Sequence, residues 1–310
     1  MTPPVTDAGR RVPFWKVEAA RRAQMAALRA RAAVTNAPPP RDPVFVVGCP
    51  RSGTTLLFGM LARHPAFGSL PTEGHVLWSA YQHPARKGWT SDRAVAADIA
   101  PRERRYLRSA MDRVARGRRF LDKTPKNVLR VPYLAELFPT ATFVFIRRDP
   151  RDTVGSLIEG WLARQGISYR LPLPLRLAEY RGPYWSYVLV PGWRDLIGTS
   201  VAEVAARQYA DSNEAFLADR ALVDPARVVE VRYEDLVAMP LREAHRILDV
   251  LELPPSGEVT AFASDLGAHR ASQLTPPGPG KWRRRAEDIA RVWPQLREVA
   301  GRLGYEDVPA

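Results

Sequence analysis

The sequence predicts an α/β protein in three layers, with a central parallel sheet flanked by helices. Short apolar runs that suit buried strands occupy residues 44–47 and 142–146, and residues 227–233 alternate in hydrophobicity as a third strand would. Helical spacing or a helix-start signal follows each run. Because strands alternate with helices along the chain, neighbouring strands are expected to run parallel.

Length and composition predict one large domain. The chain has 310 residues, and 45% of them are hydrophobic, which is enough for a sizeable core. We expect the domain to span residues 44–310. Residues 1–43 are expected to lie outside it, with disorder at 1–12, a basic, alanine-rich helix at 14–34 and a proline-rich linker at 36–43. That helix is expected to pack on the domain or on a partner subunit.

The predicted elements of the domain follow one another in a regular order. The helix after residue 149 has the clearest start signal, because Asp149 can accept hydrogen bonds as an N-cap and Pro150 suits the first helical position. Residues 76–100 and 254–280 are expected to be irregular, and Pro294 is expected to break the terminal helix. Helices are predicted at 54–63, 102–116, 131–137, 200–219 and 241–253, and strands at 44–47, 120–123, 142–146 and 227–233.

The segment Gly48–Thr55 has the spacing of a phosphate-binding P-loop, G-x-x-x-x-G-K-[ST], but Thr54 replaces the lysine. In nucleotide triphosphatases this lysine contacts the β- and γ-phosphates, so its absence argues against a triphosphate ligand. The glycines and the amides at the following helix start still form a cradle for an anion. The predicted ligands in this loop are the cation of Arg51, the hydroxyls of Ser52, Thr54 and Thr55, and the backbone at Gly53.

Two motifs resemble the cofactor site of sulfotransferases that use 3′-phosphoadenosine 5′-phosphosulfate (PAPS). Residues 50–56, Pro-Arg-Ser-Gly-Thr-Thr-Leu, resemble their 5′-phosphosulfate loop. Arg148, at the end of a predicted strand, and Ser156, on the following helix, resemble the pair that binds the 3′-phosphate. In open α/β sheets ligands bind at such strand ends. Arg151 is either a further phosphate contact, a solvated charge or a partner of Asp152.

A third motif, Phe120–Asn127, places Lys123 at the end of a short strand. Sulfuryl transfer resembles phosphoryl transfer, because both depend on positioning and on cations near the transferred group. Cytosolic sulfotransferases have a Lys-Thr-His segment here, and by that resemblance Lys123 stabilises the sulfonate. Pro125 replaces the histidine base, so that role is not carried over. Lys126 is left open between a contact and a solvated charge.

The base must therefore come from another segment. Tyrosylprotein sulfotransferases use a glutamate that follows the phosphate-loop helix, soon after a His-Pro step. Here His64-Pro65 is followed by Glu73, which matches that glutamate with one residue of slip. A carboxylate beside lysine and arginine is ionised at neutral pH and can accept a hydroxyl proton. His75 is the alternative base.

Two C-terminal features extend the resemblance, which covers about residues 44–300. Tyr233, in Val231–Leu236, is expected near the adenosine or the sulfate. Lys281, and less directly Ser272, resemble the late loop that closes over the 3′-phosphate. The resemblance implies a P-loop-type fold and is nearer to bacterial enzymes of the tyrosylprotein and heparan type than to steroid and phenol sulfotransferases.

The resemblance implies an enzyme that transfers a sulfuryl group from PAPS to a hydroxyl acceptor. The products would be a sulfate ester and adenosine 3′,5′-bisphosphate (PAP), and no metal would be needed. Arg51, Lys123 and Glu73 are the expected catalytic residues. Two alternatives stay open: a P-loop nucleotide kinase or phosphotransferase, which would need magnesium and ATP, and a nucleotide-binding protein without turnover.

The acceptor is not identified by the sequence. Residues 160–199 are rich in tryptophan, tyrosine and proline, and form either a lid over the acceptor or a packed excursion. Small molecules, sugars, glycolipids and peptide tyrosines all fit, and the oligomeric state stays open.

The net charge of +13 suits an anionic cofactor, and no nucleic-acid-binding signature accompanies it. A single cysteine, Cys49, and the lack of an apolar run of about 18 residues indicate a cytoplasmic protein without a transmembrane segment.

Overall fold

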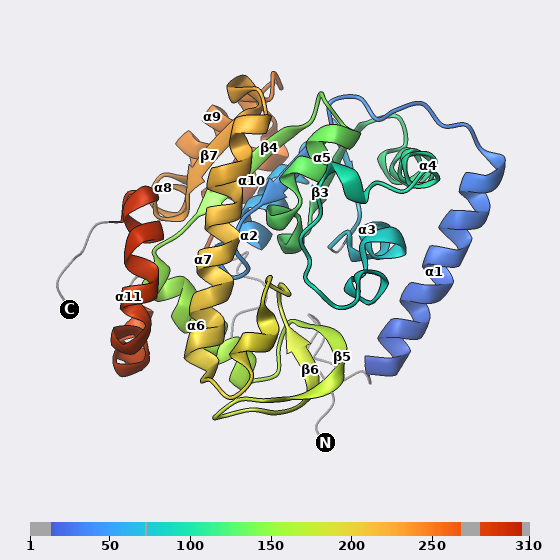
Figure 1. Cartoon of the computed structure of the whole chain (residues 1–310). Coiled ribbons are helices and arrows are strands. Elements are labelled where there is room, and N and C mark those ends of the chain that lie inside the picture. The colour runs from blue at the N-terminus through green and yellow to red at the C-terminus, as the bar shows by residue number, and fades with distance from the viewer. Residues whose placement is uncertain (1–13, 72, 268–279, 306–310) are drawn as a thin grey trace.

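The computed structural model describes residues 14–71, 73–267 and 280–305 (Figure 1). The disorder expected at 1–12 and the contact expected from Ser272 lie outside these residues.

A five-stranded, fully parallel sheet forms the centre of the molecule and confirms the predicted α/β fold. Its register sets Val46 beside both Lys123 and Val144, so the carboxyl ends of three strands meet at one edge. The short edge strand Phe67–Ser69 is the strand of this sheet that the sequence analysis missed. In spatial order the strands are β2 (Phe67–Ser69), β3 (Arg119–Lys123), β1 (Val44–Val47), β4 (Thr142–Arg147) and β7 (Val228–Arg232).

Two hydrophobic cores lie on opposite faces of this sheet, because successive strand side chains point to opposite sides. Val44 and Val46 belong to one core, and Phe45 and Val47 belong to the other. The first core is covered by α2 (Thr54–Leu61), α8 (Tyr233–Ala238), α9 (Pro240–Val250) and α10 (Gly257–Ser264). The second is covered by α3 (His75–Gln82), α4 (Glu103–Ala115), α5 (Val131–Leu137), α6 (Pro150–Leu162), α7 (Val201–Asp219) and α11 (Ala286–Arg302).

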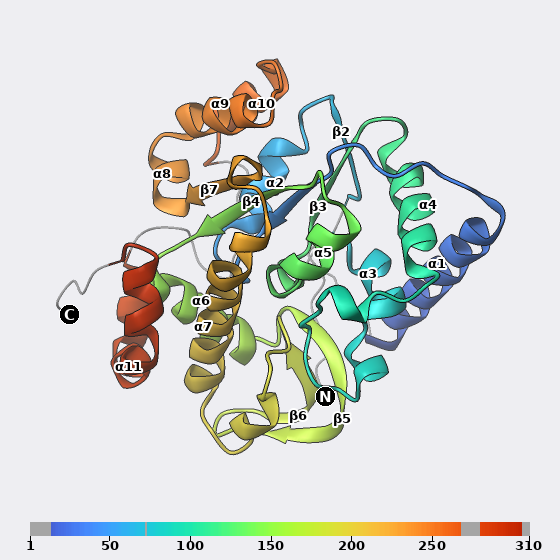
Figure 2. The same cartoon turned by 45° about the horizontal axis from the view of Figure 1, so that its top comes forward.

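The N-terminal helix α1 (Phe14–Val34) packs on the domain beside α3 and α4 (Figures 1 and 2). Leu28 and Ala32 are buried in this contact, and Arg31 pairs with Asp112 at 3.3 Å. At the start of α1, the Phe14 ring meets a tyrosine of the hairpin described next. The helix was expected to pack either on the domain or on a partner subunit, and the structure shows it packed on the domain.

A two-stranded antiparallel hairpin, β5 (Ile167–Arg176) and β6 (Arg181–Ser186), lies apart from the sheet (Figure 2). It occupies the aromatic-rich segment 160–199. Whether that segment acts as a lid stays a prediction.

Three sequence expectations about local structure are wrong. Residues 76–100 are mostly α3 and short 3₁₀ turns, and the segment 254–280 contains α10. Pro294 lies inside a continuous α11. The buried residues Ile289, Val292, Leu296 and Val299 keep helical spacing across it, so packing against α6 and α7 outweighs the hydrogen bond that proline removes.

Within the described part of the chain, no helix combines the length and the apolarity that crossing a membrane requires.

Candidate active site

The phosphate loop connects β1 to α2 and depends on its two glycines. A Cβ atom on Gly48 would lie 2.5 Å from the carbonyl oxygen of Ile146, and Gly53 has the left-handed φ of 104°. Ser52 is buried, and its hydroxyl donates to the carbonyl of Cys49 (2.7 Å). A phosphate contact from that hydroxyl would therefore compete with a bond that shapes the loop. Burial raises the pKa of the Cys49 thiol, which fits a packed residue better than a reactive one.

Arg51, Arg148 and Ser156 come together at the carboxyl end of the sheet, as the sequence predicted. Arg51 Nε donates to Ser156 Oγ at 3.0 Å, and Arg148 Nη1 is 3.4 Å from the carbonyl oxygen of Arg51. The Arg148 guanidinium lies 4.3 Å from the centre of the Tyr233 ring. Its Nε is buried and has no hydrogen-bond partner among the described residues. A buried donor of this kind indicates a site for an acceptor atom of a ligand.

Asp152 attaches the late loop to this cluster. Its carboxylate accepts hydrogen bonds from the backbone amides of Gly280 and Trp282, both at 3.2 Å. Lys281 lies between them, and its pKa is lowered by burial and by the nearby charge of Arg148. The loop thus places a further cation beside the predicted 3′-phosphate pair.

The ion pair recorded for Arg151 is with Asp149 rather than Asp152. The two groups lie 2.7 Å apart, and the Arg151 guanidinium lies 5.1 Å from the Trp282 ring centre. The carboxylate of Asp152 instead faces the late loop and lies 3.7 Å from Arg148 Nη2.

A chain of polar contacts joins Lys123, Glu73 and His75. Lys123 is buried, and its ammonium donates to Glu73 Oε1 (2.6 Å) and to Thr55 Oγ1 (3.0 Å). The other Glu73 oxygen lies 2.5 Å from His75 Nε2. Burial raises the pKa of Glu73, but the charge of Lys123 and the contact with His75 outweigh it and hold the pKa well below its usual range. Glu73 is therefore ionised at neutral pH.

His75 is neutral at that pH. Burial and the charge of Lys126 lower its pKa to about 4, against the opposing effect of Glu73. Its Nε2 faces a carboxylate, so the neutral ring donates its Nε2 proton to Glu73. In this arrangement His75 orients Glu73, and the sequence alternative of His75 as the base stays untested.

Asp122 was not identified as a site residue by the sequence analysis. It is buried and accepts hydrogen bonds from the side chains of Trp78 (3.1 Å), Asn127 (3.0 Å) and Thr124 (3.2 Å). A Cβ atom on Gly74 would collide with its Oδ1. Asp122 thus fixes the turn that follows Glu73, while burial raises its own pKa to about 6.

The remaining predicted contacts fall around the same loop. Thr54 is buried at the start of α2, whereas Thr55 accepts from Lys123. Tyr233 packs against Gly53, where a Cβ would collide with its ring. Among the described residues, no group of three or more His, Cys, Asp or Glu side chains is arranged to hold a metal ion.

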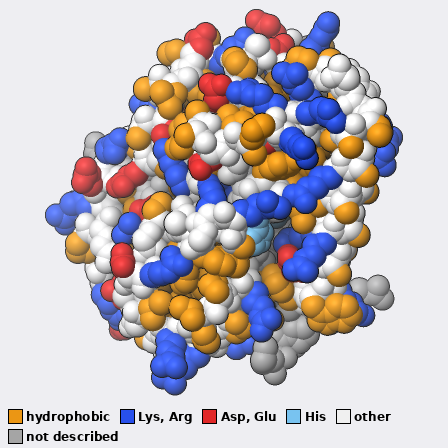
Figure 3. Space-filling model, turned by 45° about the vertical axis from the view of Figure 1, so that its right-hand side comes forward, with side chains coloured by type: hydrophobic (Ala, Val, Ile, Leu, Met, Phe, Trp, Pro, Cys, Tyr) orange, Lys and Arg blue, Asp and Glu red, His pale blue; other side chains and the backbone are white. Residues whose placement is uncertain are grey.

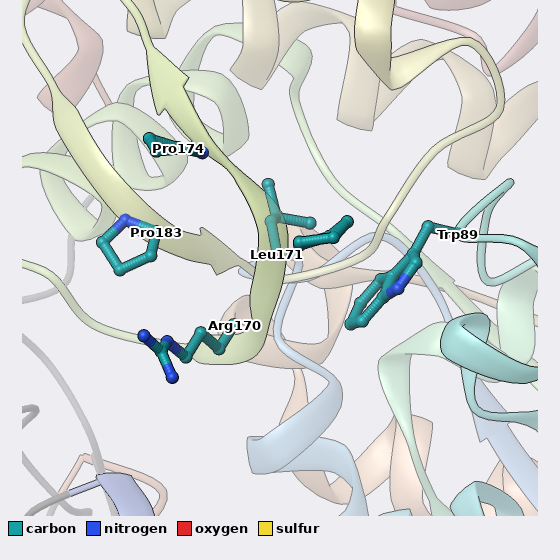
Figure 4. Close-up of a pocket in the computed structure, with 6 residues that line it drawn as sticks. Trp89, Arg170, Leu171, Pro174 and Pro183 are labelled. Atoms are coloured by element: carbon teal, nitrogen blue, oxygen red, sulfur yellow. The ribbon is translucent and has the colours of Figure 1, made fainter.

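An open pocket of about 410 Å³ lies on the hairpin (Figure 4). Trp89 forms one side, and its ring lies 6.0 Å from that of Tyr169 on β5. The lining residues are Trp89, Arg170, Leu171, Pro172, Pro174 and Pro183.

Comparison with known proteins gives a consistent result. A profile described as the sulfotransferase family matches residues 43–256. Nodulation protein NoeE of Sinorhizobium fredii is 30% identical over 70% of this chain and 51% of its own length. Omega-hydroxy-beta-dihydromenaquinone-9 sulfotransferase Stf3 of Mycobacterium tuberculosis is 24% identical over 85% of this chain and 75% of its own. Protein-tyrosine sulfotransferase A of Caenorhabditis elegans is 24% identical over 68% of this chain and 50% of its own length. The chain spans about half the length of two of these three relatives.

Solved structures share the fold. Sulfotransferase STF9 from Mycobacterium avium superposes with a TM-score of 0.60 at 17% identity, over 91% of this chain and 81% of that one. The sulfotransferase domain from the curacin biosynthetic pathway gives a TM-score of 0.51 at 16% identity, over 87% of this chain and 99% of that domain. At these identities the likeness concerns the arrangement of strands and helices.

Proposed function

The chain belongs to the sulfotransferase family, and from this premise we propose that it transfers a sulfuryl group from PAPS to a hydroxyl acceptor. The observation that carries the proposal is the meeting of two groups of residues at one edge of the sheet. Arg51, Arg148 and Ser156 form a cationic cluster, and Lys123, paired with Glu73, contacts Thr55 of the same phosphate loop.

The first group suits the two anionic ends of PAPS. Arg148 has a buried Nε donor, Ser156 lies within reach of Arg51, and Lys281 stands next to Arg148. In the proposal Arg148, Ser156 and Lys281 bind the 3′-phosphate, and Tyr233 lies beside the nucleoside. The loop residues Ser52, Gly53, Thr54 and Thr55, with Arg51, hold the 5′-phosphosulfate through backbone amides and side chains.

The second group suits the transfer itself. The acceptor oxygen attacks the sulfur in line as the bond from sulfur to the bridging phosphate oxygen breaks, and that oxygen leaves as part of PAP. Glu73 accepts the hydroxyl proton, since it is ionised at neutral pH. Lys123 and Arg51 offset the charge that develops on the sulfonate and the leaving oxygen. As Glu73 takes up the proton, Lys123 is released from their ion pair to serve the leaving side.

For the acceptor we propose a small molecule, sugar or glycolipid that bears a hydroxyl group. Two relatives are named for a hydroxylated menaquinone and for protein tyrosine, which supports a hydroxyl acceptor in general. The pocket on the hairpin, with Trp89, Leu171 and three prolines in its lining, offers an apolar surface for part of such an acceptor.

Calorimetry with PAP, AMP and ATP tests the donor. We expect PAP to bind at least about tenfold more tightly than AMP, because only PAP offers the 3′-phosphate to a charge-assisted hydrogen bond. Equal affinity for PAP and AMP would contradict the proposal. Radiolabelled PAPS supplied with a metabolite extract then tests transfer: a sulfated product detected by mass spectrometry identifies the acceptor.

A further inference from the structure

Lys126 is a buried cation that the proposed chemistry does not use. It lies in the 3₁₀ turn Pro125–Leu129 that follows β3, and the residue is only 5% exposed. Its ammonium stands 3.8 Å above the centre of the Tyr169 ring. Among the described residues, no side chain or carbonyl forms a hydrogen bond or ion pair with it. Lys123, three residues earlier, has both kinds of contact.

The carboxylates near Lys126 are engaged elsewhere. Asp92 accepts from Arg130 (2.9 Å), from the hydroxyl of Tyr169 and from the amide of Leu189 (2.8 Å). Glu73 is held by Lys123 and His75. A buried ammonium is costly without an anionic or hydrogen-bonding partner, and a single ring face offsets only part of that cost.

The charged groups around Lys126 are paired with one another, so Lys126 is the cation of this cluster that has no ionic partner among the described residues. Arg130 and Arg21 of α1 both interact electrostatically with Lys126. Each forms its own ion pair, Arg130 with Asp92 (2.9 Å) and Arg21 with Glu18 (3.1 Å). Figure 3 shows a hollow on the side where α1 lies, with a histidine at its floor and Lys and Arg side chains around its rim.

We infer that Lys126 binds an anionic group, a carboxylate or a phosphate, on the acceptor molecule that Glu73 deprotonates. The inference rests on the proposed function and adds the chemical class of the acceptor. The anion would accept hydrogen bonds from the ammonium of Lys126. The rings of Tyr169, His83 and Trp89 would form a wall that packs on the apolar part of the acceptor. His83 and Tyr169 lie 5.2 Å apart, ring centre to ring centre, which makes this wall continuous.

The test uses three small probes that differ in one group: 4-hydroxyphenylacetate, 4-hydroxybenzylphosphonate and the neutral 4-hydroxyphenylacetamide. Each is titrated by calorimetry into the full chain saturated with PAP. We expect at least one anion to bind about tenfold or more tightly than the amide. The better of the two anions assigns the carboxylate or the phosphate.

Variants attribute that preference to Lys126. In Lys126→Met the anions and the amide should bind equally, and Lys126→Arg should keep a preference for the anion. Lys16→Met removes the same charge from an exposed position on α1 and should behave as the unchanged chain. Thermal unfolding monitors each variant, and Lys126→Gln takes the place of Lys126→Met if the latter does not fold.

Two results would overturn the inference: no preference for either anion in the unchanged chain, or a preference that survives in Lys126→Met. Failure of PAP to bind is a separate outcome. It would overturn the proposed donor, and with it the premise of this inference.

Discussion

The proposed donor side and the proposed acceptor side of this site are built in different ways. The donor side consists of loops at the ends of β1 and β4, where backbone geometry sets most of the contacts, as the positions of Gly48 and Gly53 show. The acceptor side is assembled from α1, α3, the turn after β3 and the hairpin. Its contacts, such as Lys126 over Tyr169, join side chains far apart in the chain. In the proposed function, a donor side set by backbone geometry would keep its cofactor while changes of side chain on the acceptor side alter the acceptor.

The largest expected effect lies where the two sides meet. Glu73→Gln should lower turnover by about 10²–10⁴, because a general base contributes on that order, while PAP affinity stays within about twofold. Calorimetry and the rate of PAPS consumption separate the two effects. His75→Phe is the matched control: we expect a smaller loss, since His75 orients Glu73. If Glu73→Gln keeps its rate while His75→Phe loses it, His75 is the base.

The second prediction concerns Asp122, which holds the turn that follows Glu73. Its folded-state pKa of about 6 lies above the ordinary value near 4, so the folded protein holds this proton more tightly than the unfolded chain. Stability from this group is present below about pH 4 and is lost as pH rises to about 6. The free energy of unfolding, relative to Asp122→Asn, should therefore fall by about 2–3 kcal/mol across this window.

Urea unfolding of the unchanged chain and of Asp122→Asn at pH 4, 5, 6 and 7 measures that difference. Groups common to both proteins cancel in the comparison. A difference that rises with pH would mean that the hydrogen bonds from Trp78, Thr124 and Asn127 outweigh burial and hold Asp122 ionised.

A smaller effect is expected from one arginine of the donor side. Arg148→Ala should weaken PAP binding at least about tenfold, since a lost hydrogen bond to a charged group costs about 1.5–3 kcal/mol. AMP binding should change little, because AMP lacks the 3′-phosphate. Arg151→Ala, three residues later in the first turn of α6, is the control, and its ion pair with Asp149 predicts a weaker effect. If Arg148→Ala weakens the binding of PAP and AMP equally, Arg148 does not bind the 3′-phosphate.

The same contrast explains what the sequence could predict. Four strands of the sheet, the phosphate loop and the start of α6 follow from local patterns: apolar runs or alternation, glycine spacing and an Asp-Pro helix start. The Arg148–Ser156 pair was expected from the resemblance to sulfotransferases. The hairpin was not predicted, because its strands mix proline, arginine and apolar residues without clean alternation. The role of Asp122 and the burial of Lys126 depend on contacts with Trp78 and Tyr169, which no local pattern encodes.

The smallest expected effect concerns magnesium on the donor side. We predict that sulfuryl transfer is unchanged in excess EDTA. A P-loop kinase uses magnesium and its loop lysine to neutralise the β- and γ-phosphates. Here Thr54 stands at the lysine position, the transferred sulfonate carries less charge than a terminal phosphate, and Arg51 and Lys123 supply fixed cations.

Thr54→Lys extends the EDTA test. Thr54 is buried, so a lysine there must displace the loop, and we expect weaker use of PAPS without any gain of ATPase activity. Thr54→Ser, which keeps the hydroxyl and the space, is the matched control and should stay active. Transfer is measured with and without chelator and again after magnesium is added back. A complete loss that magnesium restores would show that the donor side works as a phosphotransferase loop, and the Arg51–Lys123 pair would then lack the role proposed for it.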